Sequence, residues 1–510
     1  MYTYNQLYFQ HKKLYTKYLK KLIIILNSAH DKQYNRDYWE PIIGIYLRRI
    51  LVCFLFLKNI SGNKNLFKKL NFKEIYFFRN YREFSNLFDF GLSKKVKFFE
   101  IKDNRRYQKY EINEKNFILH FTNQLKIIIP NFLIKIGVTK VLFFESYFKK
   151  KLKYYFCLRS ALSFYPLPNL KLDNYTIEKK KIFENRLNLM SLNKNQIKND
   201  QLLKNILLYM PVNYIENHRL IHDEVKKINL SNAIYTDGNE INLDYIKFYI
   251  GQLKLNKKRI LVGQHSLRSG LEDFDIFFDY SKSICNNFFT WGWKNKLSFI
   301  RKFSSMRIFS SLSKFKKVEK VENKISKICF ILCGFSQIGE ALYDNFIENK
   351  KAESARIKLL KEINNQKKID IILKPRSGSF LSSENDKFYK KFKILKHKTR
   401  MYEIFGKYSL VIFERLSLGI VESIYLNQPT IFYYPKSLYK IKNKKYNDVI
   451  NLLKKANIFF DDFKKIEKII NTKESISNWW FNKKNIQKRK KILTNYAKCF
   501  EFKDLEKLSS

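Results

Sequence analysis

The best-defined candidate site is a short loop that follows an apolar run of the sequence. Arg259 to Gly263 predicts a strand, and Gln264, His265 and Arg268 come directly after it. A histidine at a strand end can act as a general acid or base, and a nearby arginine can clamp a phosphate. The same residues would also suit an ordinary strand-to-loop turn with a surface histidine, so the sequence leaves both interpretations open.

Two further cations follow a second apolar run. Ile369 to Leu373 predicts a strand, and Lys374 and Arg376 come next, before the pair Ser377-Gly378. Cations and turn N–H groups at a strand end can hold the phosphates of a nucleotide. In a chain with this much lysine, Lys374 could equally be a solvated charge. Arg376 is the stronger candidate because arginine is scarce here.

Two carboxylates lie around the start of a predicted helix. Leu410 to Phe413 predicts a strand, and Glu414 follows it. Glu422 lies inside the helix predicted from Leu418 to Leu426. An acid at this place in an α/β fold can accept the hydroxyls of a ribose or a sugar. For Glu414, a simple interaction with the helix dipole is an adequate alternative.

A metal site is not predicted. His218 and His222 have the i, i+4 spacing of two zinc ligands on one helical turn, but no third ligand is identifiable. Asp273 and Asp275 resemble a carboxylate pair that holds a metal nucleotide, a pattern that recurs by chance. We therefore expect neither a metal nor a cofactor.

The elements that would position these residues alternate between strand and helix. The first sixty residues predict two helices, residues 60–130 give no clear pattern, and Leu243 to Leu255 predicts a helix between two strands. Further strands are predicted at Val138 to Phe144, Ala233 to Thr236, Asn287 to Trp291, Ile325 to Leu332 and Thr430 to Tyr434. Strand–helix–strand order favours parallel sheets.

The predicted fold class is α/β, with two Rossmann-like domains facing a cleft and a helical N-terminal segment. The N-terminal domain is expected over 1–293 and the C-terminal domain with its final helix over 325–510. The Lys- and Ser-rich stretch 294–324 is expected to be a linker. Ligands of such folds bind outside the carboxyl ends of the strands.

The composition adds a formal charge of +53, from 99 Lys and Arg against 46 Asp and Glu in 510 residues. Only 19 of the 99 are Arg, the residue best suited to bind phosphate groups. The positive charge is therefore better explained by an A+T-rich coding sequence than by selection for binding a polyanion. Nucleic acid is therefore a disfavoured partner. The apolar fraction of 45% excludes a mostly disordered chain.

The compartment can be predicted from three absences in the sequence. The six cysteines lack paired spacing, no signal peptide is visible, and Arg48 and Arg49 interrupt the apolar stretch Pro41 to Leu57. We expect a reducing, cytoplasmic location, and leave open a peripheral contact with an anionic inner membrane.

Four segments of the sequence carry a pattern of order and spacing. They are Leu26-Asn27 with His30 and Tyr38 to Gly44; Met210-Pro211 with Tyr214 to Glu216; Gly263 to His265 with Gly270 and Thr290 to Trp293; and Leu410 to Ile412 with Val421-Glu422, Asn427 to Ile431, Asn457 to Phe459 and Trp479-Trp480. Together they resemble the bacterial surface-carbohydrate transferases, whose members look like GT-B glycosyltransferases. This implies that the domain 1–293 lies on the acceptor side and that the domain 325–510 binds the nucleotide donor. The chain departs from the family pattern at Ser266-Leu267 and Ser269-Gly270, and at Leu418, where Ser417 stands beside the place of a family threonine.

The resemblance implies transfer of a sugar from a nucleotide-linked donor to a bacterial surface polysaccharide or glycolipid. It implies that His265, with Gln264 beside it, is catalytic. Arg376, Lys374, Glu422, Ser417 and Arg268 are the predicted donor-binding residues. Two alternatives stay open: transfer of a polyol phosphate from a cytidine-linked donor, and a non-catalytic basic protein that binds anionic glycan or nucleic acid.

Overall fold

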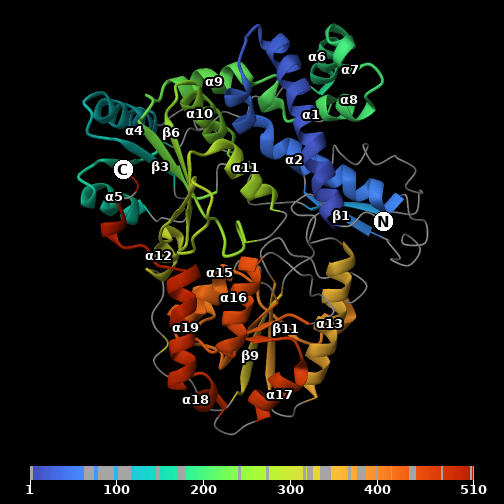
Figure 1. Ribbon diagram of the computed structural model, residues 1–510, viewed down its shortest axis with the longest axis vertical. Helices are drawn as coiled ribbons and strands as arrows, with labels where there is room; N and C mark the ends of the chain where they lie inside the picture. The colour runs from blue at the N-terminus through green and yellow to red at the C-terminus, as the bar shows by residue number, and fades with distance from the viewer. Residues whose placement is uncertain are drawn as a thin grey trace.

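The computed structural model has two α/β halves, one above the other in Figure 1. The structure describes residues 4–61, 74–78, 97–101, 117–144, 150–168, 179–208, 210–238, 243–271, 275–313, 318, 325–332, 346–365, 369–375, 386–396, 399–414, 416–435, 444–471, 475–505 and 508.

The N-terminal half is built on six parallel strands. Their order across the sheet is β4 (Phe164–Pro166), β3 (Val141–Phe144), β5 (Ala233–Thr236), β6 (Arg259–Gly263), β7 (Asn287–Thr290) and β8 (Ile300–Lys302). Most of the inner strands are continuous apolar runs, as a parallel sheet that is covered on both faces requires.

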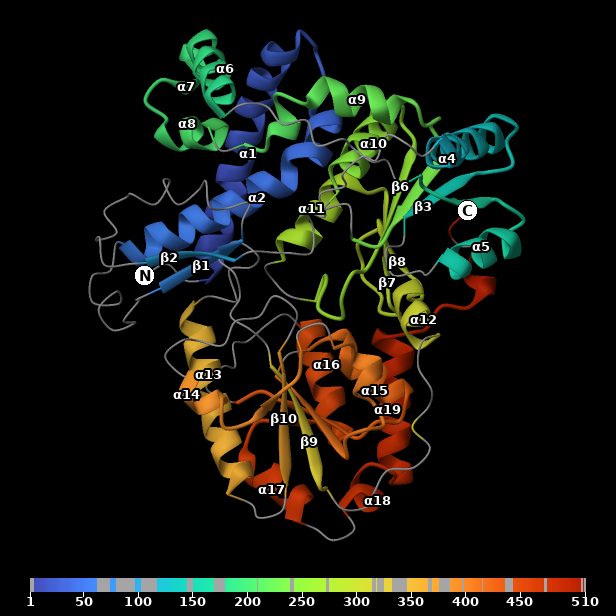
Figure 2. The same cartoon turned by 180° about the vertical axis from the view of Figure 1, so that it is seen from behind.

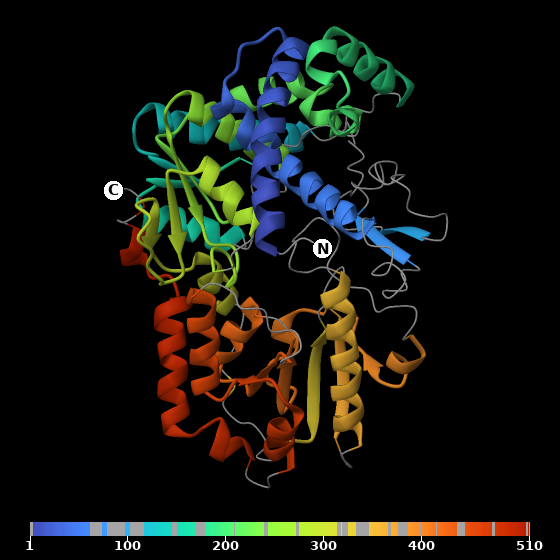
Figure 3. The ribbon, with the colours of Figure 1, turned by 45° about the vertical axis from the view of Figure 1, so that its right-hand side comes forward.

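The C-terminal half repeats this architecture with six more parallel strands. Their order is β11 (Lys393–Ile394), β10 (Asp370–Pro375), β9 (Lys327–Leu332), β12 (Leu410–Phe413), β13 (Thr430–Tyr433) and β14 (Phe459–Phe460). In Figure 3 the gold helix α13 (Phe346–Asn364) lies on one side of these strands, and the red helices α16 (Lys444–Lys455) and α19 (Lys483–Tyr496) lie on the other. The predicted α/β class with two Rossmann-like sheets is therefore confirmed.

The helical N-terminal segment is also confirmed. Helix α1 (Tyr4–His30) packs against α2 (Arg36–Ser61), and α2 packs against α10 (Asp244–Leu255) and α11 (Ile276–Ile284) of the N-terminal half. Figure 2 shows the blue helices α1 and α2 between α6 to α8 on the left and α10 and α11 on the right. Within the described part of the chain, no helix combines the length and apolar character needed to cross a bilayer.

Two further strands, β1 (Glu74–Phe78) and β2 (Lys97–Ile101), form a separate parallel pair. The other described α-helices are α4 (Phe117–Lys135), α5 (Lys150–Arg159), α6 (Lys179–Leu192), α7 (Lys194–Ile197), α8 (Gln201–Leu208), α9 (His218–Lys226), α12 (Met306–Leu312), α14 (Asp386–Tyr389), α15 (Leu418–Tyr425), α17 (Phe463–Asn471) and α18 (Ser475–Trp479).

The chain crosses between the halves twice. The first crossing follows β8 and α12, two elements inside the stretch 294–324 that the sequence suggested was a plain linker. In the second, the residues after α19 return to the N-terminal half, where Ser305 pairs with Cys499 and the Ser304 hydroxyl donates to Asp504 at 2.6 Å. The domain boundaries at 293 and 325 stay a prediction.

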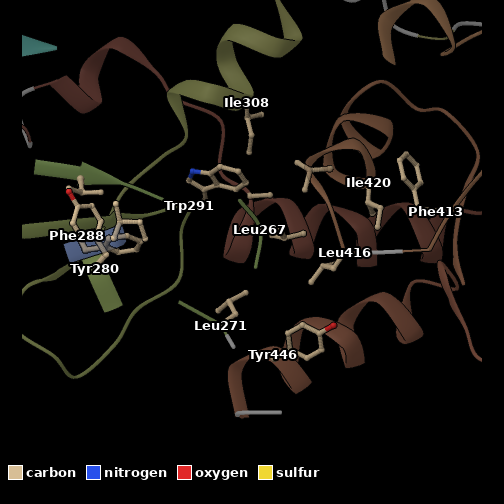
Figure 4. Close-up of a cluster of buried hydrophobic side chains, with 14 of the residues drawn as sticks. Leu267, Leu271, Tyr280, Phe288, Trp291, Ile308, Phe413, Leu416, Ile420 and Tyr446 are labelled. Carbon is tan, nitrogen blue, oxygen red and sulfur yellow. The ribbon is translucent and has the colours of Figure 1, made fainter. Parts of the chain in front are cut away.

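The two halves meet through buried apolar side chains. One continuous core cluster includes residues of both sheets. Figure 4 draws part of it, with Leu267 and Trp291 from the N-terminal half and Leu416 and Ile420 from the C-terminal half. Ile308 of α12 is fully buried in the same cluster. The predicted cleft between the halves stays a prediction.

Candidate active site at the junction of the two halves

His265 lies immediately beyond the carboxyl end of β6, where the sequence placed it, and is half-buried. Its Nδ1 is 2.9 Å from the backbone oxygen of Asp237, which follows the neighbouring strand β5. A carbonyl oxygen can only accept a hydrogen bond, so Nδ1 must carry the proton. In the neutral ring, Nε2 then holds the lone pair and is the atom able to accept a proton from a substrate.

Gln264 is buried and holds the loop beside it. Its Oε1 accepts hydrogen bonds from the backbone N–H of Trp291 at 2.8 Å and from the indole N–H of Trp293 at 2.9 Å. Its Nε2 donates to the carbonyl oxygen of Ser266 at 2.7 Å. These contacts describe a positioning residue for the loop around His265, and a catalytic role for Gln264 stays a prediction.

Arg307 is a site residue that the sequence reasoning missed. It lies on α12 and its Nη1 donates to the backbone oxygen of His265 at 2.6 Å. The only signal that could have found it is the scarcity of arginine, since the contact joins residues 42 positions apart.

Glu422 is buried on α15, and it points toward the other half of the molecule. Its carboxylate accepts a hydrogen bond from the hydroxyl of Ser311, which lies on α12. Arg307 and Ser311 are four residues apart, so they share one face of α12. One short helix therefore contacts both the predicted catalytic histidine and the predicted donor-binding carboxylate.

The other predicted donor-binding residues are dispersed around this junction. Lys374 is buried at the end of β10, where its Nζ donates to the backbone oxygen of Pro375 at 2.7 Å. Ser417 is the N-cap residue of α15 and makes no side-chain capping bond. Arg268 is half-buried in the turn after His265, and Arg376 lies outside the described residues. The donor-binding role of all four stays a prediction.

Glu414, the second candidate carboxylate, forms an ion pair inside the C-terminal half. Its Oε1 is 2.5 Å from Nε of Arg356 on α13, and both side chains are buried. Burial lowers the pKa of Arg356, but the Glu414 carboxylate and the Tyr389 hydroxyl together outweigh it and leave the pKa raised. The ion pair gives Glu414 a structural role.

The comparison with known families decides the class of the protein. The family model described as "LIC12162 family transferase" matches residues 3–508, nearly the whole chain. The chain belongs to this transferase family. No curated protein matches the chain in sequence.

Among solved structures, the transferase is similar to the spinosyn rhamnosyltransferase SpnG in complex with spinosyn aglycone. The identity is 9% over 76% of this chain and 96% of that chain, with a TM-score of 0.32. UGT2 of Phytolacca americana, solved with UDP-2-fluoro-glucose and pterostilbene, gives 9% identity, the same coverage and a TM-score of 0.32. Because these scores are low, the case for the fold rests on the transferase's own two parallel sheets.

His218 and His222 belong to a buried aromatic cluster in this transferase. The Tyr38 hydroxyl is 3.0 Å from Nε2 of His218 and 2.8 Å from Nδ1 of His222, and the ring of His30 stacks on His218 at 4.1 Å. Burial lowers the pKa of His222 to about 4 and that of His218 to about 2. Within the described residues, no group of three or more His, Cys, Asp or Glu side chains is arranged to hold a metal ion.

The tryptophan pair that helped to suggest the family stabilises the C-terminal half. The indole N–H of Trp479 donates to Asn457 O at 2.7 Å, and that of Trp480 lies 3.1 Å from Asn427 Oδ1. Both asparagines have positive φ, at 54° and 61°, a conformation that asparagine tolerates better than most residues. These motif residues stabilise the chain just after the ends of α15 and α16.

Proposed function

We propose that this transferase moves a sugar from a nucleotide-linked donor to a glycan or lipid-linked acceptor. The observation that carries the proposal is the meeting of His265 and Glu422 at α12, on the junction of two parallel sheets. His265 Nε2 would take the proton of the acceptor hydroxyl, and Glu422 would hold hydroxyls of the donor. A bacterial surface polysaccharide or glycolipid as acceptor is part of this proposal, and follows from the resemblance alone.

The start of α15 is suited to the phosphates of the donor. The N–H groups of a first helical turn carry partial positive charge, and a phosphate there makes favourable hydrogen bonds. Ser417 leaves this turn without a side-chain cap, and Gly419 packs so tightly that an added Cβ would lie 2.6 Å from the Phe413 ring. The buried charge of Lys374 at the end of β10 adds a cation to the same half. The leaving diphosphate would thus be neutralised by the chain itself.

Nucleotide-dependent stabilisation tests this proposal. We expect one member of a panel of UDP, dTDP, GDP, ADP and CMP to raise Tm, because a ligand at 100 times its Kd adds about 2.7 kcal/mol to the unfolding free energy. Glu422→Gln should reduce the rise in Tm. The control Glu362→Gln, on α13, should keep it.

The outcome of the same panel separates the alternatives. Stabilisation by CMP alone would favour a polyol-phosphate transferase with a cytidine-linked donor. If no nucleotide changes Tm, and binding to anionic glycan or nucleic acid falls by decades between ~50 and 200 mM salt, the transferase acts as a basic binding protein and the proposal is wrong.

A peripheral contact with an anionic membrane belongs to the same proposal. Helices α4 and α5 expose large apolar side chains, with no acidic residue in 125–140 or 151–160. These side chains are Ile128, Ile129, Phe132 and Ile136 of the α4 region, and Tyr154, Tyr155 and Leu158 of α5. The exposed residues Lys126, Lys135, Lys151 and Arg159 lie among them. Apolar side chains flanked by cations match the surface of an anionic bilayer.

Vesicle sedimentation measures this contact. We expect the transferase to sediment with phosphatidylglycerol vesicles and not with phosphatidylcholine vesicles. The double variant Phe132→Ser, Leu158→Ser should remain in the supernatant. Because the exposed cations alone would also attract anionic lipid, a double variant that still sediments fully would contradict a role for the apolar face.

A further inference from the structure

Helix α12 is the one place where the predicted base and the predicted donor carboxylate have a common neighbour among the described residues. Its N-cap Ser305 accepts a hydrogen bond from the N–H of Ile308 at 3.0 Å, which fixes where the helix begins. Ile308 is fully buried, so the helix cannot shift without disturbing the core between the halves. The adjoining face carries Arg307 and Ser311.

The contact of Arg307 with His265 has an informative geometry. Nη1 of Arg307 lies 3.2 Å from Nδ1 and 3.1 Å from Nε2 of the same imidazole ring. An atom placed along the Nε2 lone pair would be much farther from Nδ1, so Nη1 lies over the face of the ring. The Arg307 Nη1–H group therefore points at this face of the imidazole, and the in-plane Nε2 lone pair points past it.

Three contacts together fix the position and plane of the His265 ring. Its Nδ1–H donates to Asp237 O, Arg307 covers one face, and the same guanidinium holds the His265 backbone oxygen at 2.6 Å. The backbone at Gly238 also packs closely against the His265 side chain, since a Cβ added to Gly238 would lie 2.7 Å from the His265 Cβ. This packing restricts movement of the ring. A ring held this way presents Nε2 in one direction.

The same helix is tied to the C-terminal half at its other end. The Ser311 hydroxyl donates to Glu422 on α15. The end of α15 is fixed as well, because the Tyr425 hydroxyl donates to Ala497 O at 2.9 Å and accepts from the Cys499 N–H at 3.0 Å. Cys499 in turn pairs with Ser305, the residue that caps α12. Helices α12 and α15 therefore share one anchor, the C-terminal tail.

We propose that Arg307 is the positioning residue of His265, and that α12 links the orientation of this ring to Glu422 in the other half. The inference rests on the proposed function for the role of His265 only. When the Ser311–Glu422 hydrogen bond joins the two halves, α12 holds Arg307 in place, and Arg307 holds the His265 ring with Nε2 oriented for catalysis. Preorganisation of this kind keeps a catalytic group in place before the substrate binds.

Carbethoxylation by diethyl pyrocarbonate tests the proposal without any substrate. The reagent reacts with the lone pair of an imidazole nitrogen, and mass spectrometry gives a separate rate constant for each histidine. Arg307→Ala should raise the rate constant at His265 several-fold, because the ring loses its cover and can turn. Arg307→Lys should not restore the original value, since a lysine ammonium lacks the rigid planar guanidinium whose Nη1 contacts both the ring and the His265 backbone oxygen.

The controls are a second arginine and a second histidine. Arg301→Ala, which removes an exposed arginine from β8, should leave His265 unchanged. Buried His218 reports loss of the fold. If Arg307→Ala raises the carbethoxylation rate constants of both His265 and His218, Arg307 has a general structural role and the proposal is overturned. An unchanged rate constant at His265 would overturn it too.

Ser311→Ala tests the link to the C-terminal half. Ser311 does not touch His265 in any contact of the described structure, so a rise at His265 in this variant must be transmitted by α12. If His265 reacts as in the wild type, the link is refuted. Since the reagent and the nucleotide panel are independent, failure of nucleotide stabilisation would leave the Arg307 result standing.

Discussion

Acidification from pH 7 to pH 5 should lower the unfolding free energy of the transferase by several kcal/mol. Burial lowers the pKa of His222 to about 4, of His11 to about 3 and of His218 to about 2, against an ordinary 6.5, and lowers that of His30 as well. Below pH 6.5 the unfolded chain binds protons that the folded chain does not. Stability is therefore complete above about pH 6.5 and falls as the pH drops toward the folded pKa values.

The expected size makes this one of the two largest effects. One pKa unit corresponds to about 1.4 kcal/mol, so His11, His218 and His222 each remove up to about 2 kcal/mol by pH 5, and His30 acts in the same direction. A domain is stable by only about 5 to 15 kcal/mol in total. Two carboxylates with lowered pKa, Asp200 and Asp244, lose their contribution only below about pH 4. Asp279, whose pKa burial raises, works in the opposite direction.

Urea unfolding at pH 7.5, 6.5, 5.5 and 5.0 measures the effect. His222→Asn keeps a hydrogen-bonding side chain near Tyr38 but cannot titrate. We expect this variant to be less stable at pH 7.5 and to lose less stability on acidification. Its unfolding free energy should change with pH as if about one proton fewer were taken up on unfolding. Equal unfolding free energies at pH 7.5 and 5.0 in the wild type would contradict the assignment of the buried histidines as neutral.

Much of the architecture could be predicted because the strands of a buried parallel sheet are continuous apolar runs. Ala233 to Thr236, Arg259 to Gly263 and Leu410 to Phe413 were predicted with the bounds that the structure has. Elements with few apolar residues were missed. Strand β8 has one buried residue, Ile300, and α12 lies in a stretch whose Lys and Ser content suggested a linker.

The candidate site was predictable only in part, since its strand-end residues follow local patterns and its cross-chain partners do not. His265 follows β6 as expected, but nothing near Arg307 in the sequence indicates its partner. Glu422 was found on a helix, while its contact with Ser311 joins residues 111 positions apart. Contacts of this length depend on how the two sheets are joined, which local pattern does not encode.

The motif residues behind the family resemblance have turned out to be largely structural. Asn27 accepts from the indole N–H of Trp39 at 2.8 Å and donates to Tyr34 O at 2.9 Å, which closes the turn between α1 and α2. Glu216 forms a buried ion pair with Arg186 at 2.7 Å. Their spacing therefore reports the fold of the family more directly than its chemistry. The functional argument depends on the few motif residues at the junction, above all His265.

Replacing His265 with alanine should reduce the rate of donor turnover by about 10²- to 10⁴-fold, the usual contribution of a general base. Turnover is measured with the sugar donors of whichever nucleotide in the panel raises Tm, as release of that free nucleotide. His265→Gln should be equally slow, because an amide has no lone pair of comparable basicity. Stabilisation by the free nucleotide should persist in both variants, since His265 belongs to the half opposite Glu422.

The control for this loss is Ser266→Ala, which changes the next residue of the same loop. Ser266 Oγ is 3.1 Å from Ser269 Oγ and, within the described part of the chain, forms no hydrogen bond with the imidazole, so we expect turnover close to wild type. Full turnover in His265→Ala would remove the base from the mechanism while leaving donor binding intact. Loss of both turnover and nucleotide stabilisation would instead show that His265 holds the junction together, because α12 then fails to keep Glu422 in place.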